Sequence, residues 1–265
     1  MTRAATARCL FLGVEFDCLT RGAAAERVAA LAADASFAYI VTPNVDHIVG
    51  LHRAADLELS ASYQAAALCL CDSRIVARLA RWSGLVLPVV PGSDLTRDLI
   101  EAVLPPCKIA VVGGDTALHR DLAARFPRFA WSFHQPPMGV RRNPAARAAI
   151  ADFVETAAAD VLFLAIGAPQ SEIVSAEIRA RGAARGVALC IGASLEFMTG
   201  AKSRAPLWMQ RASLEWLYRL LTEPRRLWRR YLVDGPRIFR IWWQWRSLKT
   251  DRRHASSGSS PSDCA

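Results

Sequence analysis

Short apolar runs alternate with longer, alanine-rich amphipathic stretches through the first 200 residues of the chain. Each run has the length of a buried strand, and the stretches between the runs are long enough for helices. The predicted strands are residues 9–16, 37–41, 65–71, 107–112, 161–166 and 187–191. Because strands and helices alternate, we predict an α/β core over residues 1–200, with a Rossmann-like, mostly parallel sheet that carries helices on both faces.

Capping residues and helix breakers organise the segments between the strands. Thr20 can cap a helix that ends near Asp34, and Asn44 can cap the helix that follows the second strand. Further helices are predicted at 73–82, 91–103, 144–158 and from residue 170 onward. Residues 131–143 contain prolines, a glycine and two adjacent arginines, and we predict a loop there.

Polar and glycine residues follow the predicted strands at the point where each strand ends. They are Thr42, Asn44, Asp72, Gly113, Gly114, Gly167, Gln170 and Gly192. Since the carboxyl ends of parallel strands share one edge of a sheet, these residues predict a single ligand cleft at that edge. The Gly113-Gly114 turn suits the close approach of a phosphate or a sugar, but no dinucleotide-binding glycine motif is present.

Asp72 is the candidate among these residues with the clearest chemistry. It ends a buried strand and precedes a predicted helix, a position where a carboxylate can serve as a general base. The alternative is that Asp72 only caps that helix, and the local sequence does not favour either role.

From residue 201 to residue 250 the pattern changes to helices alone, which predicts a basic helical appendage. Between Lys202 and Arg253 there are 14 Lys and Arg residues against 4 acidic residues, and six of the eight tryptophans lie in the same segment. Arginine interleaved with Trp and Leu is typical of a helix on an anionic bilayer. The same residues also suit a bound diphosphate, a nucleic acid, or a helix that packs on the domain with a solvated basic face. Residues 251–265 are predicted to be a disordered tail.

The appendage offers candidates for two membrane roles. For lipid phosphates they are Arg225, Arg230, Arg237 and Arg240, and for interfacial anchoring they are Trp228, Trp242, Trp243 and Trp245. Trp208 and Trp216 suit core packing as well as anchoring.

Composition favours a cytosolic globular protein. Hydrophobic residues make up 52% and charged residues 22% of the chain, enough for a sizeable core. The seven cysteines include no Cys-x-x-Cys pair, so we expect reduced thiols and neither disulfides nor a zinc site. No apolar run has the length of a membrane span, and residues 1–12 lack a signal-peptide pattern, so any membrane contact is expected at the bilayer surface.

Several short motifs lie in a defined order along the chain. They are Thr42-Pro43-Asn44, Asp72, Pro91-Gly92-Ser93-Asp94, Gly167-Ala168-Pro169-Gln170-Ser171-Glu172, Arg204-Ala205-Pro206, Glu215-Trp216-Leu217-Tyr218-Arg219 and Glu223-Pro224-Arg225-Arg226. Their order and spacing, over roughly residues 11–232, resemble the WecG/TagA/CpsF glycosyltransferases (glycosyltransferase family twenty-six). The resemblance implies an inverting enzyme that moves a sugar from a UDP donor to an undecaprenyl-diphosphate-linked acceptor. It would act at the cytoplasmic face of the bacterial plasma membrane and build lipid-linked precursors of surface polysaccharides.

The resemblance also implies roles for individual residues. Asp72 would be the base, Thr42 and Asn44 would line the acceptor side of the cleft, and Gln170 would line the donor side. Arg219, Arg226 and Arg229 match the arginines of the terminal motif and would include a contact to the donor diphosphate. Their spacing puts them on one helical face if the helix runs on, although Pro224 is expected to break it.

No metal or other cofactor is expected. The resemblance implies a metal-independent transferase, and the chain has no strict Asp-x-Asp motif with which to hold a cation. Arginine is then expected to neutralise the charge that develops on the departing UDP.

The chain departs from the family pattern at three positions. Ser73 follows Asp72 where glycine is usual, Val89 stands where an arginine is common, and Glu196 precedes Phe197 where Asp is usual. The donor therefore stays open between N-acetylmannosamine, its uronic acid and a hexose such as glucose. A catalytically inactive membrane-surface scaffold and a basic nucleic-acid-binding protein are the alternatives, although the tryptophan-rich appendage favours a membrane over a nucleic acid. Self-association is left open.

Overall fold

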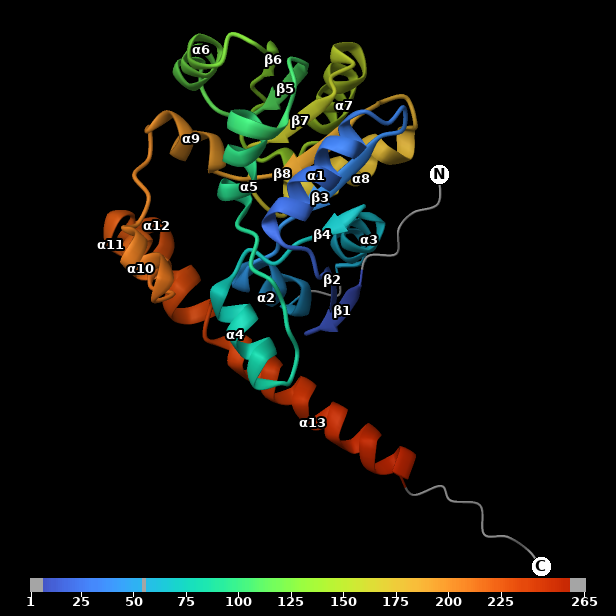
Figure 1. Cartoon of the computed structure of the whole chain (residues 1–265), viewed down its shortest axis with the longest axis vertical. Coiled ribbons are helices and arrows are strands. Elements are labelled where there is room, and N and C mark those ends of the chain that lie inside the picture. Colours follow the sequence, from blue (N-terminus) through green and yellow to red (C-terminus); the bar gives the residue numbers. More distant parts are fainter. Residues whose placement is uncertain (1–6, 54–55, 258–265) are drawn as a thin grey trace, which may run out of the picture.

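The structure is a computed structural model that describes residues 7–53 and 56–257, with side chains as far as residue 248. Six parallel strands form one sheet in the order β4-β3-β8-β7-β5-β6 (Figure 1). The strands are β3 (Ala38–Val41), β4 (Leu68–Cys69), β5 (Lys108–Val112), β6 (Ala130–His134), β7 (Val161–Leu164) and β8 (Val187–Cys190). The predicted α/β fold with a parallel sheet and flanking helices is confirmed.

The central strands β3, β8 and β7 are buried along their whole length. Their side chains alternate between the two faces of the sheet, as the pleat of a strand requires. In β3, Tyr39 and Val41 belong to one hydrophobic cluster, whereas Ala38 and Ile40 belong to the other. This two-faced core explains why these strands appear in the sequence as continuous apolar runs.

Helices cover both faces of the sheet (Figure 1). On one side lie α1 (Arg21–Ala32), α5 (Gly92–Asp98) with the π-helical turn Leu99–Val103, α6 (Thr116–Arg125) and α9 (Ser194–Thr199). On the other side lie α2 (Val45–Arg53), α4 (Arg74–Trp82), α7 (Pro144–Ala157) and α8 (Gln170–Arg181), with α3 (Leu57–Ala65) packed on α8. The predicted caps are confirmed, since Thr20 Oγ1 accepts from Ala23 N and Asn44 Oδ1 accepts from Asp46 N.

The predicted first strand is instead a hairpin. Residues 9–16 do not form one buried strand, because β1 (Arg8–Phe11) and β2 (Val14–Asp17) pair antiparallel in a separate two-stranded sheet. Leu12 and Gly13 form the turn with φ angles of 51° and 78°. Both residues lie in the left-handed region that tight hairpin turns require, and Gly13 reaches it without a steric penalty.

The predicted loop at 131–143 is wrong over its first residues. Residues 130–134 form the edge strand β6, and a short 3-10 helix spans Val140–Arg142. An edge strand pairs on one side only, and β6 is not fully buried at any position, so it lacks the continuous apolar run used to predict strands. The strand predicted at 65–71 is also shorter, because β4 is limited to Leu68–Cys69.

The C-terminal appendage consists of helices, as predicted. They are α10 (Leu207–Arg211), α11 (Glu215–Thr222), α12 (Pro224–Trp228), the π-helix η3 (Arg229–Asp234) and α13 (Arg237–Ser257). The expected disordered tail 251–265 begins inside α13, because the sequence has no Gly or Pro between Arg237 and Gly258 to end the helix earlier. Residues 258–265 lie outside the described residues. Within the described part, no helix has an apolar stretch long enough to cross a bilayer.

The last helix returns to the start of the chain. The Trp245 ring packs edge-on against Phe11 of β1 with the ring centroids 5.0 Å apart, and Trp242 Nε1 donates to Ser83 Oγ at 2.8 Å. Trp242 and Trp245 are thus part of the packing of α13 on the hairpin and on α4. This changes the sequence-based assignment, in which both were interfacial anchors.

Candidate active site

The ends of β3 and β4 are hydrogen-bonded together. Thr42 is buried and donates from Oγ1 to the carbonyl of Cys190 at 3.3 Å, which ties the end of β3 to β8. The backbone N–H of Asp72 donates to the carbonyl of Pro43 at 3.0 Å. Thr42, Asn44 and Asp72 are therefore neighbours on one edge of the sheet, as the strand-end positions predicted.

Asp72 does not cap α4. The neighbouring Ser73 does so, because its Oγ accepts from the backbone N–H of Val76 at 3.2 Å. The helix-capping role that the sequence left open for Asp72 therefore belongs to Ser73. The serine that departs from the family pattern takes the capping role, and the carboxylate of Asp72 is left for another function.

The surroundings of Asp72 raise the pKa of its carboxyl to about 8. Burial is the main cause, and the negative charge of Glu215 adds to it. The backbone N–H of Gly92 and the positive charges of Arg219 and Arg204 act in the opposite direction. A carboxylate with so high a proton affinity is suited to accept a proton near neutral pH.

Arg204 joins three carboxylates at this site. It donates to Asp94 Oδ1, its Nε lies 4.0 Å from Glu215 Oε1, and its charge acts on Asp72. Burial alone would raise the pKa of Asp94, but the bond from Arg204, together with Arg97 at 3.4 Å and Arg21 at 3.8 Å, lowers it. Asp94 is therefore a paired structural carboxylate, unlike Asp72.

Sequence reasoning did not assign Arg204, Asp94 and Glu215 to the site. All three belong to the motifs that carried the family resemblance, and their place in these motifs could have assigned them to the site. What the sequence alone did not show is that the linker before α10 and the start of α11 fold back onto the end of β4.

The three arginines of the terminal motif do not share one helical face. α11 ends at Thr222 and α12 starts at Pro224, as the proline predicted. Arg219 acts on Asp72 and stacks over the ring of Phe197 at 5.7 Å. Arg226 pairs with Glu223 at 2.5 Å, and Arg229 is exposed. Arg219 is thus the arginine of this set that the fold brings to the candidate base.

The predicted glycine and glutamine residues lie farther along the same edge. β5, which precedes Gly113, is separated from β4 by three strands, so the two ends are about 19 Å apart at normal strand spacing. β7, which precedes Gly167, is nearer, at about 14 Å. The strand-end residues therefore form one row along the edge, with Gly192 after β8 between Thr42 after β3 and Gly167 after β7, and the row is about 19 Å long from β4 to β5.

Contacts within the protein explain part of this row. A Cβ at Gly113 would lie 2.9 Å from the backbone of Ala165, so glycine is required for close packing there. Gln170 donates from Nε2 to the carbonyl of Ile166, and its Oε1 accepts from the backbone N–H of Arg141 at 3.4 Å. A ligand on the Gln170 amide would have to displace one of these bonds.

A buried acid and a histidine support the loop that carries Asn44. His47 Nδ1 accepts from the backbone N–H of Asn44 at 3.1 Å, and its Nε2 lies 3.8 Å from Glu172 Oε1. Burial raises the pKa of Glu172 to about 7, and burial together with Arg230 lowers the pKa of His47 to about 3. Arg230 pairs with Asp46 at 3.1 Å, so η3 of the appendage also holds this loop.

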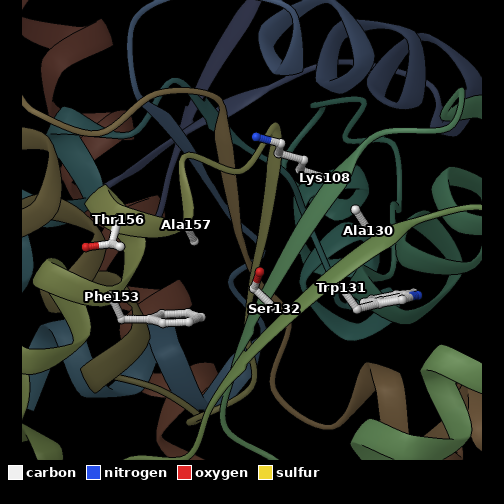
Figure 2. A pocket seen from close by; sticks show the side chains of 7 residues that line it. All are labelled: Lys108, Ala130, Trp131, Ser132, Phe153, Thr156 and Ala157. Atoms are coloured by element: carbon white, nitrogen blue, oxygen red, sulfur yellow. The ribbon is translucent and has the colours of Figure 1, made fainter.

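A separate hollow of about 430 Å³ lies away from this edge. It is lined by Lys108, Ala130, Trp131, Ser132, Phe153, Thr156 and Ala157 (Figure 2). Lys108 and Ala130 are the first residues of β5 and β6, so the hollow is at the amino ends of these strands. Figure 2 shows Phe153 and Trp131 on opposite sides of Ser132. The predicted site residues do not line this hollow.

The sequence of nearly the whole folded chain is similar to that of a known protein family. The sequence model of the Glycosyl transferase WecG/TagA/CpsF family matches residues 9–252, which includes the sheet, the Asp72 edge and the appendage. The chain belongs to this family. It is therefore a glycosyltransferase, as the motifs predicted.

Curated relatives in the WecG/TagA/CpsF family carry a specific name. One is the N-acetylglucosaminyldiphosphoundecaprenol N-acetyl-beta-D-mannosaminyltransferase of Staphylococcus aureus strain MRSA252, 26% identical over 85% of this chain and 89% of the relative. The enzyme with that name from strain NCTC 8325 is 25% identical over the same shares. A Bacillus spizizenii enzyme of the same name is 39% identical, over 31% of this chain and 32% of its own length.

The described residues of this WecG/TagA/CpsF protein include no group of three His, Cys, Asp or Glu side chains arranged to hold a metal ion. The charged groups near Asp72 are the guanidinium groups of Arg204 and Arg219 and the carboxylate of Glu215. A carboxylate base can take a proton from a hydroxyl, and neighbouring arginines can stabilise the negative charge of a departing diphosphate. These are the two requirements of glycosyl transfer from a sugar nucleotide.

Proposed function

We propose that this glycosyltransferase moves N-acetylmannosamine from UDP to an N-acetylglucosaminyl-diphospho-undecaprenol acceptor, with inversion at the anomeric carbon. The observation that carries the proposal is the Asp72 carboxyl, which has a pKa of about 8 and lies where Arg204 and Arg219 of the C-terminal segment meet the strand ends. The name shared by the relatives supports the choice of sugar and acceptor. The uronic acid of N-acetylmannosamine and glucose are the other donors to test.

In this proposal the reaction is a single displacement. The ionised Asp72 removes the proton from the acceptor hydroxyl while that oxygen bonds to the anomeric carbon and the bond from this carbon to the UDP oxygen breaks. Thr42 and Asn44, beside Asp72, position the acceptor sugar. Arg219 neutralises the charge on the departing UDP, with Arg226 and Arg229 as further partners of the donor, so that the reaction proceeds without a metal.

Gln170, Gly113, Gly114 and Gly167 belong to the donor side of the cleft in this proposal. The distance of the β5 and β7 ends from Asp72, about 14 to 19 Å, leaves room for an extended nucleotide along the sheet edge. The Gln170 amide would exchange its bond to Arg141 for one to the sugar or to uracil.

We further propose that the appendage holds the enzyme on the cytoplasmic surface of an anionic bilayer. Trp208, Trp228 and Trp243 are exposed by 64%, 51% and 68%, and they lie among exposed arginines. Apolar rings of this kind enter the headgroup boundary while arginines meet lipid phosphates. Peripheral attachment would bring Asp72 to an acceptor whose lipid stays in the membrane.

A transfer assay tests this function. Purified protein is incubated with a panel of UDP-sugars and a short-chain polyprenyl-diphosphate-GlcNAc acceptor, in EDTA, and the anomeric configuration of the product is read by NMR. We expect product with UDP-N-acetylmannosamine that persists in EDTA. Product with another donor alone would correct the sugar, and loss of product in EDTA would contradict metal independence. UDP binding without product from any donor would favour the inactive scaffold.

A further inference from the structure

Asn44 is held by two hydrogen bonds at the start of α2. Its Oδ1 accepts from the backbone N–H of Asp46 at 3.0 Å, and its own backbone N–H donates to His47 Nδ1 at 3.1 Å. The first bond uses the carbonyl end of the side-chain amide, so Nδ2 is the end that can donate to a ligand. A sugar hydroxyl or a phosphate oxygen is a suitable partner for it.

His47 stands where a helix usually has a different capping residue. It is the third residue of α2, the position at which Glu or Gln closes a capping box by accepting from the backbone N–H of the cap residue. An imidazole has two nitrogens on a rigid ring, so one nitrogen can hold the cap while the ring is oriented through the other. The partner of the second nitrogen therefore decides how firmly Asn44 is placed.

That second nitrogen faces a buried carboxyl. His47 Nε2 lies 3.8 Å from Glu172 Oε1, too far for a hydrogen bond but close enough for attraction between an imidazole N–H and a carboxyl oxygen. The Glu172 side chain is 3% exposed, and its Oε2 has no hydrogen-bond partner among the described residues. Burying such a group costs stability, so apolar packing does not account for an acid at this position.

These contacts select one tautomer of a neutral ring. Because Nδ1 accepts from the N–H of Asn44, it carries no proton, and the ring proton is on Nε2, toward Glu172. A charged imidazolium has no free lone pair and could not accept this bond. Burial and the positive charge of Arg230 lower the pKa of His47 to about 3, so the ring stays neutral at physiological pH.

The same pair joins the two sides of the proposed cleft. His47 is in the first turn of α2, beside Asn44 on the acceptor side, and Glu172 is in the first turn of α8, which begins at Gln170 on the donor side. α8 is packed between α3 and α7 and has six buried residues, so it is a firm support. Through Glu172 and His47 this support extends to the acceptor loop.

We propose that His47 and Glu172 are positioning residues for acceptor binding. Glu172 orients the imidazole, and the imidazole holds the backbone of Asn44 so that the side-chain amide can donate to the acceptor. The inference rests on the acceptor role of Asn44 in the proposed function. A bond that only capped α2 would stabilise the helix without changing acceptor affinity, and acceptor affinity is therefore the quantity to measure.

A set of variants of the full chain tests this role. His47→Leu removes both ring nitrogens, His47→Gln keeps an oxygen that can accept from the cap residue, and Glu172→Gln removes the carboxylate at nearly constant size. Asn44→Ala is the reference, alone and combined with His47→Leu. The matched control is His52→Leu, because His52 is on the same helix and its Nε2 lies 2.9 Å from the carbonyl of Leu12.

Calorimetry measures the affinity for a short-chain polyprenyl-diphosphate-GlcNAc in saturating UDP, and the affinity for UDP alone. We expect His47→Leu to weaken acceptor binding by about tenfold and Glu172→Gln by about threefold, with UDP affinity unchanged. His47→Gln should recover part of the loss, and His52→Leu should cause none. Because His47 acts through Asn44, His47→Leu should add little to the effect of Asn44→Ala. In transfer assays the KM for the acceptor should rise while kcat changes little.

Three results would overturn the inference. They are wild-type acceptor affinity in His47→Leu, a loss no greater than that of His52→Leu, and a loss that is fully additive with that of Asn44→Ala. Wild-type acceptor affinity in Asn44→Ala would instead overturn the proposed acceptor role of Asn44, and this inference with it. The nitrogen NMR spectrum of the wild-type imidazole gives a readout that does not depend on a folded variant. Near pH 7 we expect a protonated Nε2 and an unprotonated Nδ1 in His47, and the opposite tautomer would contradict the proposed geometry.

Discussion

The carboxylate of Glu215 on α11 lies close enough to Asp72 for its negative charge to raise the pKa of that acid. The two residues belong to different parts of the chain, since Asp72 follows β4 of the core and Glu215 starts a helix of the appendage. Arg204 lies between the two parts, bonded to Asp94 of the core and 4.0 Å from Glu215. The docked position of the appendage therefore helps to set the proton affinity of the candidate base.

Transfer is expected to rise with pH, to reach half of its maximum at about pH 8 and to level off near pH 9. Asp72 must be ionised to accept a proton, and with a pKa of about 8 only about a tenth of it is ionised at pH 7. The measurement is kcat/KM between pH 6 and 9.5 with the donor that gives product. A rate that does not change across this range would remove Asp72 from the proton-transfer step.

Glu215→Gln is expected to move the rising limb of that pH profile to lower pH. The substitution removes the negative charge that raises the pKa of Asp72, while Arg204 and Arg219 still lower it. Glu215→Asp, which keeps the charge, should restore much of the original profile. The control is Asp152→Asn, a surface carboxylate that pairs with Arg181 on the far side of the core. A profile for Glu215→Gln that coincides with the wild type would show that Glu215 does not act on the base.

Asp72→Asn is expected to lower kcat by a factor of about one hundred or more, the usual cost of losing a general base. UDP binding should be retained, because the amide keeps the size of the side chain and the arginines are untouched. Single-turnover kinetics with the identified donor, together with UDP calorimetry, test this expectation. Loss of UDP binding in the variant would mean that Asp72 holds the donor and is not only a base.

The same variant should be more stable than the wild type at alkaline pH. The pKa of Asp72 is about 8 in the folded protein and near 4 when unfolded, so the folded state binds the proton more tightly and loses stability as pH rises between these values. An asparagine side chain does not ionise, so the variant does not lose this stability as pH rises. After allowance for solvent screening, we expect a gain of about 1–3 kcal/mol at pH 9 and less at pH 5. Urea unfolding at the two pH values measures the difference.

Two tryptophans on α13 are expected to separate stability from membrane binding. Trp245→Ala should cost about 2–4 kcal/mol of unfolding free energy, because Trp245 packs against the fully buried Phe11. Trp243→Ala should change stability by less than about 0.5 kcal/mol, since Trp243 is 68% exposed, but should weaken binding to anionic vesicles several-fold. Vesicle binding that is unaffected by Trp243→Ala would argue against this face as the anchor.

Gly113→Ala is expected to destabilise the protein by about 2–4 kcal/mol. Its φ is +102°, and a Cβ there would lie 2.9 Å from backbone atoms of Ala165. Gly22→Ala is the matched control, because a Cβ at Gly22 meets no atom within 4 Å and the residue is helical. Equal melting temperatures for Gly113→Ala and the wild type would show that packing against Ala165 does not require this glycine, and ligand binding would remain as its role.

The alternation of apolar runs and helices was enough to predict the sheet, because β3, β7 and β8 are buried on both faces. The pattern failed where a strand has only one covered side. β6 contains Trp131 and Phe133 but also half-exposed Ser132 and His134, so it did not stand out from a loop. The hairpin at 8–17 was missed because its turn, Leu12-Gly13, lies inside an apolar run and carries one weak signal, the glycine.

The site was predictable in part. Strand-end logic placed Thr42, Asn44 and Asp72 together correctly, since neighbouring parallel strands bring their carboxyl ends to the same edge. It did not predict that Arg204 and Glu215 would join them, because long-range docking of the appendage has no local pattern. The three terminal arginines would share one helical face only in a continuous helix, and the helix breaks at Pro224.

The contact between Phe11 and Trp245 has a consequence for synthesis on the ribosome. The hairpin emerges well before α13, which covers it in the native fold. At bacterial or eukaryotic elongation rates the interval is roughly 10–50 s. During that time the hairpin lacks the cover that Trp245 of α13 gives to Phe11 in the native fold.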